Sequence, residues 1–410
     1  MANRAAAARA PKAKPLEHNI LLTATLCLLA IGAVMVYSAS SGRTVLQGGG
    51  NGTTYLVRYL MYGAVGLVAM HLLARRGLEL VMRATTPLLA ISFFLLLAVK
   101  VPGIGVEING ARRWIGAGPL QFQPSEVAKL ALLLYAVRFL AEKPKRVNHP
   151  RLLMPLVGVI GVACLLVASQ PDLGTAIVVA GTTACLLVAA GIPLRHLAFA
   201  GAGIGCLILL FAILEPYRRA RLTSFLDPWA HASTSGFQSV QGQIALGSGG
   251  IHGVGLGESV QKIFYLPEAH TDFILAVIGE ELGMIGVCAI LFLYGLLAYA
   301  GFRIAQRATG AYAQLLAAGM TSMILCQGIL NVFTVLGLAP LTGVPLPFIS
   351  YGSTNLVVLL AGMGLLLNIA DGGRIPLRVV AGSRRESADR SGRDGGARGA
   401  RAGGRRRAAG

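Results

Sequence analysis

Residues 266–300 read LPEAHTDFILAVIGEELGMIGVCAILFLYGLLAYA. From position 271 onward the run is almost continuously apolar, which is too long for a core helix of a soluble domain and long enough to span a bilayer. Asp272 stands at its start, so the carboxylate would lie at the membrane surface with one side facing hydrocarbon. Ionisable residues at that depth are costly and mark functional sites. The stretch therefore predicts a transmembrane helix with a candidate functional carboxylate at one end.

The composition indicates that lipid surrounds most of the chain. Of the 410 residues, 55% are hydrophobic and 13% are charged, and the charged share is about half that of a soluble domain. We therefore predict an all-α polytopic membrane protein with about ten transmembrane helices. Their approximate limits are 19–40, 54–74, 84–101, 124–141, 152–169, 173–191, 196–214, 271–300, 312–337 and 348–369.

Basic residues set the predicted topology. The formal net charge is +19, and residues 371–410 alone hold 11 Arg against 4 acidic residues. With ten spans, both termini and the more basic loops fall on one side, which the positive-inside rule makes cytoplasmic. This distribution fits topology control better than nucleic-acid binding. We predict a basic cytoplasmic segment at 1–18, a membrane domain at 19–370 and a disordered Arg/Gly-rich cytoplasmic tail at 371–410.

Three further features bear on the organisation. The first apolar run follows basic residues, as in a signal peptide, but it is longer than a signal core, so we expect an uncleaved first span. Two outer loops are long, at 102–123 and at 215–270, and the second lies between helices 7 and 8. All six cysteines fall inside apolar runs without metal-ligand spacing, so we expect small buried hydrophobic residues, neither disulfides nor ligands.

Polar residues gather at the predicted outer ends of several spans. Glu126 and Lys129 lie in the first two turns of one helix, and their i,i+3 spacing places them on one face. That spacing is equally compatible with a structural ion pair. Asp172 and Asp272 begin two other helices, and the loop 343–352 ends at the same side. A transporter would place its site near mid-bilayer, so the outer position favours an enzyme that acts on a membrane-tethered substrate from outside.

Helix capping offers a structural alternative for several of these residues. Asp172 and Ser125 could cap the helices that they begin, and for Asp172 capping is the favoured interpretation. Thr271 could cap the helix that starts at Asp272, which would release the Asp272 carboxylate from that role.

Two acidic residues and a glycine-rich run complete the candidates. Glu280 and Glu281 follow Asp272 by about two turns, a depth of about 12 Å by helical rise, and we expect one of them to pair with a basic residue on another helix. The run 247–257 is rich in glycine but lacks the Gly-Lys-Ser/Thr of a P-loop. Its backbone N–H groups could line a pyrophosphate nest, although a tight loop that folds back on the bilayer is the favoured interpretation.

Seven stretches together resemble one known family. They are RWI at 113–115, FQPSEVAK at 122–129, QPDLGT at 170–175, ALGSGG at 245–250, LPEAHTDF at 266–273, EELG at 280–283 and PLPFISYG at 345–352. The chain is similar to the SEDS proteins (shape, elongation, division and sporulation), a family of bacterial cell-wall polymerases with ten spans. It looks closer to the division (FtsW) and sporulation (SpoVE) branches than to the elongation (RodA) branch. Two departures are Gly242, where the family commonly has Ser, and Ser353-Thr354, where Gly-Ser is usual.

The resemblance implies a peptidoglycan glycosyltransferase, which polymerises lipid II (a disaccharide-pentapeptide on undecaprenyl pyrophosphate) into glycan strands at the outer face. Asp272 matches the catalytic aspartate of the family and would act as general base on the acceptor hydroxyl. The departing pyrophosphate needs positive charge, from basic side chains or from a divalent cation such as Mg or Mn. The substrate-binding candidates are Arg112, Arg113, Glu126, Lys129, Gln241, Lys262, Glu268, His270 and Ser350.

The resemblance also implies partners and a location. A class B penicillin-binding protein transpeptidase, other divisome membrane proteins and membrane lipids are the expected partners, and nucleic acid is not. The expected location is the bacterial cytoplasmic (inner) membrane at the division septum. Two alternatives stay open: a lipid II flippase, which needs no base, and a non-catalytic division scaffold that docks through its Arg-rich tail. Membrane-depth carboxylates are unnecessary for a scaffold, so the polymerase ranks first.

Overall fold

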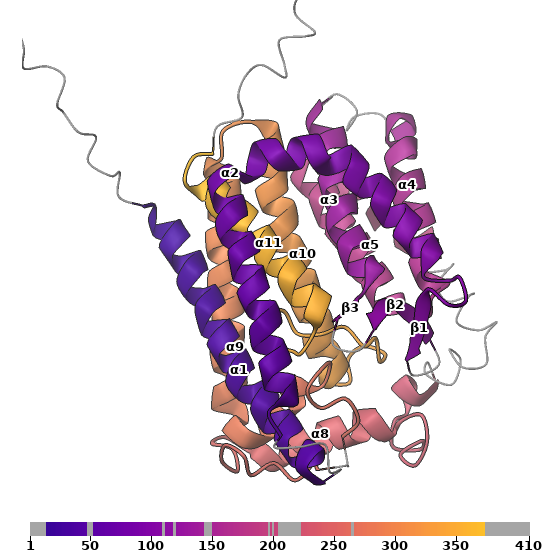
Figure 1. Ribbon diagram of the computed structural model, residues 1–410, viewed down its shortest axis with the longest axis vertical. Helices are drawn as coiled ribbons and strands as arrows, with labels where there is room; N and C mark the ends of the chain where they lie inside the picture. Colours follow the sequence, from indigo (N-terminus) through magenta and orange to yellow (C-terminus); the bar gives the residue numbers. More distant parts are fainter. Residues whose placement is uncertain are drawn as a thin grey trace, which may run out of the picture. The chain divides into compact units, whose positions relative to one another are not determined.

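The computed structural model describes nine ranges of the chain: 14–46, 52–108, 111–117, 120–142, 150–195, 197–198, 201–203, 223–263 and 266–373. These residues form long helices and one small sheet (Figure 1). The helices are α1 (Leu16–Leu46), α2 (Thr54–Ala98), α3 (Pro124–Glu142), α4 (Pro150–Ala168), α5 (Leu173–Ala189), α8 (Phe237–Gly249), α9 (Ile274–Arg307), α10 (Ala311–Val335) and α11 (Ser353–Ala370). Within the described residues, six helices are long and apolar enough to cross a membrane, and the predicted all-α polytopic class is confirmed.

The two predicted spans 54–74 and 84–101 are joined in the single helix α2. The expected loop at 75–83 is therefore wrong, because these residues are helical. The segment contains no proline, and its one glycine, Gly77, packs against Leu365 of α11. Figure 1 shows α2 running along the bundle, bending over one end and returning.

The two halves of α2 run in opposite directions. The first half runs parallel to α11, and the second half runs antiparallel to α3, although α3 and α11 begin at the same end. The contacts that fix these directions are Gly63–Leu356, Gly66–Leu360, Thr86–Arg138 and Leu96–Ala128. Helix α2 is therefore long enough, and bent enough, to supply both predicted crossings. The predicted span 196–214 lies largely outside the described residues, and the predicted tail lies outside them beyond position 373.

Helix ends that the charge pattern places on the same side of the membrane lie close together in the structure. At the predicted inner end, Glu17 near the start of α1 forms an ion pair with Arg307 at the end of α9. At the predicted outer end, the Ser353 hydroxyl at the start of α11 donates to the Gln121 carbonyl just before α3. The helix ends therefore alternate between the inner and outer sides as the basic loops predict.

The outer loop expected at 102–123 is a three-stranded antiparallel sheet. Its strands are β1 (Gly105–Ile108), β2 (Ala111–Ala117) and β3 (Leu120–Phe122), in the order β1-β2-β3. Val106 faces Trp114, and Ile115 faces Phe122. Figure 1 shows the sheet and α8 at the same end of the helices. Strands this short carry little periodicity, which is why the sequence predicted only a loop.

Helix α9 breaks at Gly283, and the glycine loop (residues 250–257) fills the break. Gly283 has φ 66° and ψ −164°, outside the helical region. The carbonyls of Glu280 and Glu281 accept from the N–H groups of Val254 and Gly255, at 2.9 and 3.1 Å. In return, the N–H groups of residues 284 and 285 donate to the carbonyls of residues 250 and 251. These four bonds give new partners to backbone groups on both sides of the break, as a buried backbone requires.

This pairing favours the tight-loop interpretation of the glycine-rich run over the pyrophosphate nest. The N–H groups of Val254 and Gly255 are occupied by α9, so they are not offered to a phosphate. The favoured tight loop is what forms, and it packs against a helix. The break lies beyond Glu280 and Glu281, so the helical rise from Asp272 to these two residues is not interrupted by it.

Two of the expected caps and the expected burial of the cysteines differ from the structure. Phe273 is the N-cap of α9, so Thr271 does not cap it. Ser125 lies inside α3, which begins one residue earlier. Asp172 does cap α5, accepting from the N–H of Thr175 at 3.2 Å. The described cysteines are free, and the expected burial is wrong: Cys27, Cys185 and Cys288 are exposed, and the other two are half-buried. Cys206 lies outside the described residues.

Candidate active site

Asp272 lies just before the N-cap of α9 and is half-buried. Its Oδ1 is 3.1 Å from the Thr271 hydroxyl, and its main-chain carbonyl accepts from Nδ2 of Asn331 on α10 at 2.7 Å. A Cβ added to Gly343 would lie 3.9 Å from Oδ2 of Asp272. The carboxylate is therefore held beside the start of the segment 343–352, here called the proline loop.

An aromatic cluster lies next to this carboxylate. The ring of His270 is 4.3 Å from that of Tyr55 on α2 and 5.6 Å from that of Tyr351, centroid to centroid. The N–H of Tyr351 donates to the His270 carbonyl at 2.9 Å, which ties the two segments together. The Arg58 guanidinium of α2 lies beside the Tyr351 hydroxyl. Arg58 thus brings a cation to the cluster.

The proline loop is irregular backbone, and it is buried from Val344 to Ser350 apart from the half-buried Pro345. Irregular backbone at membrane depth is tolerated only when protein groups satisfy it. Side chains from three helices do so here by donating to four of the loop carbonyls. The donor–acceptor pairs are Asn331–Val344 (2.8 Å), Gln327–Pro345 (2.9 Å), Tyr294–Pro347 (2.5 Å) and Tyr59–Phe348 (2.5 Å).

Glu126 and Lys129 form a buried ion pair behind the proline loop. The Lys129 ammonium lies 2.8 Å from Glu126 Oε2 and donates to Gln327 Oε1 at 2.7 Å. Both charged side chains are almost completely shielded from solvent, at 2% and 4% exposure. Gln327 also donates to the loop carbonyl of Pro345, so the pair connects to the proline loop through one amide.

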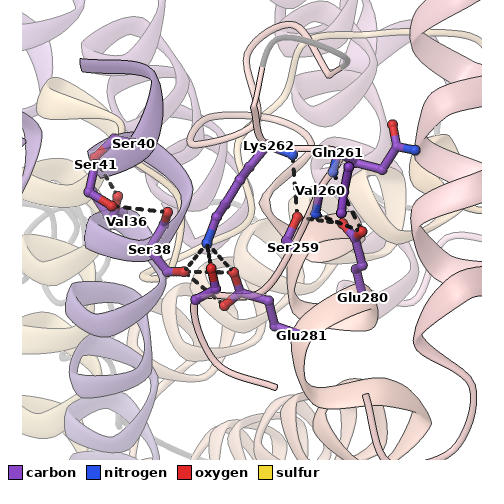
Figure 2. A network of polar contacts seen from close by, with 11 residues as sticks. Val36, Ser38, Ser40, Ser41, Ser259, Val260, Gln261, Lys262, Glu280 and Glu281 are labelled. Atoms are coloured by element: carbon purple, nitrogen blue, oxygen red, sulfur yellow. Dashed lines mark hydrogen bonds and ion pairs between the residues drawn. The ribbon is translucent and has the colours of Figure 1, made fainter. Parts of the chain in front are cut away.

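Lys262 and Glu281 form a second buried ion pair. The Lys262 ammonium uses its three donors on Glu281 Oε1 (2.7 Å), the Gly257 carbonyl (2.8 Å) and the Ser38 hydroxyl of α1 (3.1 Å). Figure 2 shows Lys262 reaching between α1 and Glu281. The expectation of one carboxylate paired with a basic residue is confirmed, although Lys262 comes from the outer segment and not from another helix.

The neighbouring Glu280 has a different set of partners. Its carboxylate accepts from the Ser259 hydroxyl and from the N–H of Val260 at 3.1 Å (Figure 2). Two adjacent glutamates of α9 therefore hold the segment that follows the glycine loop. Because that segment leads through 266–271 to Asp272, both carboxylates support the approach to the site.

Three further candidates lie on other elements of the outer end. Arg112 is exposed on β2, and its Nε donates to Glu107 of β1 at 3.1 Å. Arg113 is half-buried on the same strand. Gln241 is half-buried in α8, next to Gly242, which packs on Phe273.

Two candidates serve the backbone around Asp272. Ser350 is buried, and its hydroxyl accepts from the Leu346 N–H at 2.8 Å, which closes a turn of the proline loop. Glu268 has φ 54°, a left-handed conformation that is uncommon for a residue with a side chain. Its carboxylate lies 3.2 Å from the Thr271 hydroxyl. The structure thus gathers Glu268, His270 and Asp272 in one strained turn.

Comparison with known proteins identifies this arrangement. Residues 18–374 match the family of cell cycle proteins that groups FtsW, RodA and SpoVE. The chain belongs to that family. It is 41% identical over 353 residues to the stage V sporulation protein E of Bacillus subtilis, covering 86% of this chain and 96% of that one. It is 38% identical over 354 residues to the probable peptidoglycan glycosyltransferase FtsW of a Geobacter species, with the same coverages.

A solved structure has the same fold. It comes from work described as the structural coordination of polymerization and crosslinking by a peptidoglycan synthase complex. The TM-score is 0.70 at 32% sequence identity, covering 85% of this chain and 96% of that chain. The predicted resemblance to SEDS proteins is confirmed, and so is the likeness to the FtsW and SpoVE branches.

Both departures from the family pattern have partners in the structure. A Cβ at Gly242 would lie 2.5 Å from the ring of Phe273, so a glycine lets that ring pack closely on α8. Ser353 donates to the Gln121 carbonyl, and the Thr354 hydroxyl accepts from the Gln123 N–H at 2.9 Å. These two residues join the start of α11 to the start of α3 in this SEDS protein.

Sequence reasoning missed the residues that reach the site from other helices. Tyr55 and Arg58 lie on α2, and Gln327 and Asn331 lie on α10. The two amides had a detectable signal, because they are polar residues spaced i,i+4 in an otherwise apolar span, where polar side chains are expected to bond across helices. The α2 residues had a weaker signal, since their position at the outer end is clear only from topology.

Proposed function

We propose that this chain is a peptidoglycan glycosyltransferase that polymerises lipid II into glycan strands at the outer face of the cytoplasmic membrane. Its relatives include proteins named for that activity. The observation that best supports the chemistry is the half-buried Asp272 carboxylate, held at the predicted outer end between the aromatic cluster and the proline loop. A membrane-tethered substrate can reach such a site from the outer leaflet.

Asp272 acts as the general base in this proposal. It removes the proton from the acceptor sugar hydroxyl as that oxygen forms a bond to the anomeric carbon of the donor sugar. The bond from the anomeric carbon to the undecaprenyl pyrophosphate oxygen breaks, and the pyrophosphate leaves with the electron pair. The proton passes from Asp272 to solvent before the next cycle.

The charge that stabilises the leaving pyrophosphate comes from a restricted set of groups. Lys129 and Lys262 are buried and engaged in ion pairs, which favours structural roles for both. Arg58 next to the aromatic cluster and the half-buried Arg113 are the better candidates for binding an anion. Arginine suits that task because its planar donors match phosphate oxygens.

A divalent cation would complement these side chains. No group of three or more His, Cys, Asp or Glu side chains that could hold a metal ion occurs within the described residues. If a Mg²⁺ or Mn²⁺ ion binds, Asp272 and Glu268 are the carboxylates that would hold it, and it would supply positive charge for the leaving pyrophosphate.

The proposed setting is cell division. A class B penicillin-binding protein would crosslink the strands that this enzyme makes, with other divisome proteins and membrane lipids around it at the septum. The likeness to the FtsW and SpoVE branches supports this assignment. Colocalisation of a fluorescent fusion with the division ring tests the location, and a fusion spread evenly over the cell envelope would contradict it.

One reconstitution tests the activity. Purified protein with its cognate transpeptidase is incubated with lipid II, and the products are separated on a glycan-resolving gel in the presence of moenomycin to silence contaminating transglycosylases. We expect strands from wild type and from Glu258→Gln, an exposed outer carboxylate control, and none from Asp272→Asn. Equal strands from Asp272→Asn would remove Asp272 as the base. Folded wild type that makes no strands would favour the flippase instead.

A further inference from the structure

Asn331 and Gln327 form a pair of amides on α10 that ties the chemistry-bearing segment to the rest of the protein. They are four residues apart, so they lie on one face of the helix, and their side chains are 1% and 0% exposed. Neither is used by the proposed mechanism. Both nevertheless contact main-chain atoms that fix where the Asp272 carboxylate stands.

Asn331 joins two segments that are distant in the sequence. Its single amide nitrogen donates to the carbonyl of Asp272 at 2.7 Å and to the carbonyl of Val344 at 2.8 Å. Both of its N–H groups therefore donate to backbone carbonyls, one just before α9 and one in the proline loop. Its Oδ1 is buried and has no hydrogen-bond partner within the described part of the chain. A buried acceptor without a partner costs free energy and needs an explanation. Here the explanation is the two bonds that the amide nitrogen of the same side chain makes to the backbone.

Gln327 extends the connection to the buried ion pair. Its Nε2 donates to the Pro345 carbonyl at 2.9 Å, and its Oε1 accepts from Lys129 at 2.7 Å. The Lys129 ammonium also pairs with Glu126. The donor to Gln327 is thus a charged group, which makes a stronger bond than a neutral donor. The orientation of the Gln327 amide is thereby fixed, with its N–H groups toward the loop.

We propose that Asn331 and Gln327 are positioning residues that set the Asp272 carboxylate against the proline loop, with the Glu126–Lys129 pair as their anchor. This inference rests on the proposed function. A carboxylate that acts as a base must be held within a few tenths of an ångström of its productive position, and misplacement by 1 Å costs about 100-fold in rate. The proline loop contains no regular structure that could supply this rigidity by itself.

The kinetic test uses full-length protein with lipid II. Asn331→Ala removes both donors, and Asn331→Asp replaces them by carboxylate oxygens at constant size. Gln327→Glu keeps an acceptor for Lys129 and loses the donor to the loop. We expect kcat to fall about 10- to 100-fold for each, with KM for lipid II unchanged. The matched control is Thr321→Val, since Thr321 is a buried α10 residue whose hydroxyl bonds within its own helix.

A second measurement separates this proposal from the proposed activity. Hydrogen–deuterium exchange of segments 266–273 and 342–352 should be faster in Asn331→Ala and Asn331→Asp than in wild type, and unchanged in Thr321→Val. If wild type makes no glycan, the activity fails, and exchange alone decides the positioning role. Unchanged exchange, a wild-type kcat, or a loss confined to KM would each overturn it. If Asn331→Ala does not fold, Asn331→Asp and Gln327→Glu give the same readouts.

Discussion

The Nζ atom of Lys262 lies 2.7 Å from Oε1 of Glu281, and the two side chains are 6% and 0% exposed. The pair joins the outer segment to α9, and the Ser38 hydroxyl adds α1 to the same contact. An ion pair at this depth is sensitive to the loss of one partner, because the remaining charge stays buried without compensation.

Lys262→Met should therefore lower the free energy of unfolding by about 3–5 kcal/mol, measured by denaturant titration in detergent. The double variant Lys262→Met with Glu281→Leu should recover much of this loss, since it leaves no uncompensated charge. Breaking the exposed pair Glu79–Arg83 by Arg83→Ala is the control, with an expected change within about 0.5 kcal/mol. Equal effects at the two sites would show that burial does not decide the outcome.

Gly283 should not tolerate a side chain. Its φ of 66° suits glycine, and a Cβ there would collide with the backbone of Gly253 and Ile251. Gly283→Ala is expected to separate α9 from the glycine loop and to cost more than about 1 kcal/mol, because alanine is strained at positive φ. Gly295→Ala, in the same helix with open space at its Cβ, should be neutral or slightly stabilising. Thermal unfolding of both variants in detergent checks the difference.

Asp172 should matter beyond its role as a cap. Its Oδ1 accepts from the Thr175 N–H, and its Oδ2 accepts from Gln123 Nε2 and from the Ser125 hydroxyl. Asp172→Ala loses the cap, worth about 0.5–2 kcal/mol. It also leaves two donors at the start of α3 without their acceptor. Asp172→Asn keeps the cap oxygen and should lose less. If Asp172→Asn unfolds at the same denaturant concentration as wild type, the links to α3 contribute nothing.

Removing the Tyr294 hydroxyl should loosen the proline loop. Tyr294 donates to the Pro347 carbonyl at 2.5 Å, and Tyr294→Phe leaves that buried carbonyl without its partner, at a cost of about 1–3 kcal/mol. Tyr299→Phe on the same helix removes an exposed hydroxyl and should change little. The stability of each variant and its rate of glycan synthesis should fall together for Tyr294→Phe alone. A stable but inactive Tyr294→Phe would point to a direct role in the reaction.

Chelation tests the source of positive charge. Since Lys129 and Lys262 are held in buried ion pairs, we expect EDTA to abolish polymerisation and added Mg²⁺ or Mn²⁺ to restore it. Arg58→Ala and Arg113→Ala should lower the rate even with saturating metal. Full activity in EDTA would show that the arginines alone stabilise the leaving pyrophosphate. Unchanged activity of both arginine variants would show that the metal ion does so.

The all-α membrane class, the alternation of the ends and the family were predictable because they depend on local properties: apolar run length, basic loops and short motifs. Asp272 was found in the same way, as a carboxylate at the start of an apolar run. The Asp172 cap and the buried Glu126–Lys129 pair also followed from residue type and spacing alone.

Only the tertiary structure decided which residues meet Asp272. Asn331 follows it by 59 positions, and Tyr55, which contacts the neighbouring His270, precedes it by more than 200, so these contacts depend on how α10 and α2 pack. The tertiary structure also decided that α2 stays helical through its bend and that Gly283 breaks α9. It decided as well that N–H groups of the glycine loop donate to α9 carbonyls at that break. Local sequence predicts hydrophobicity and capping, whereas partners for buried backbone and buried charge come from whichever segments the packing brings within hydrogen-bond distance.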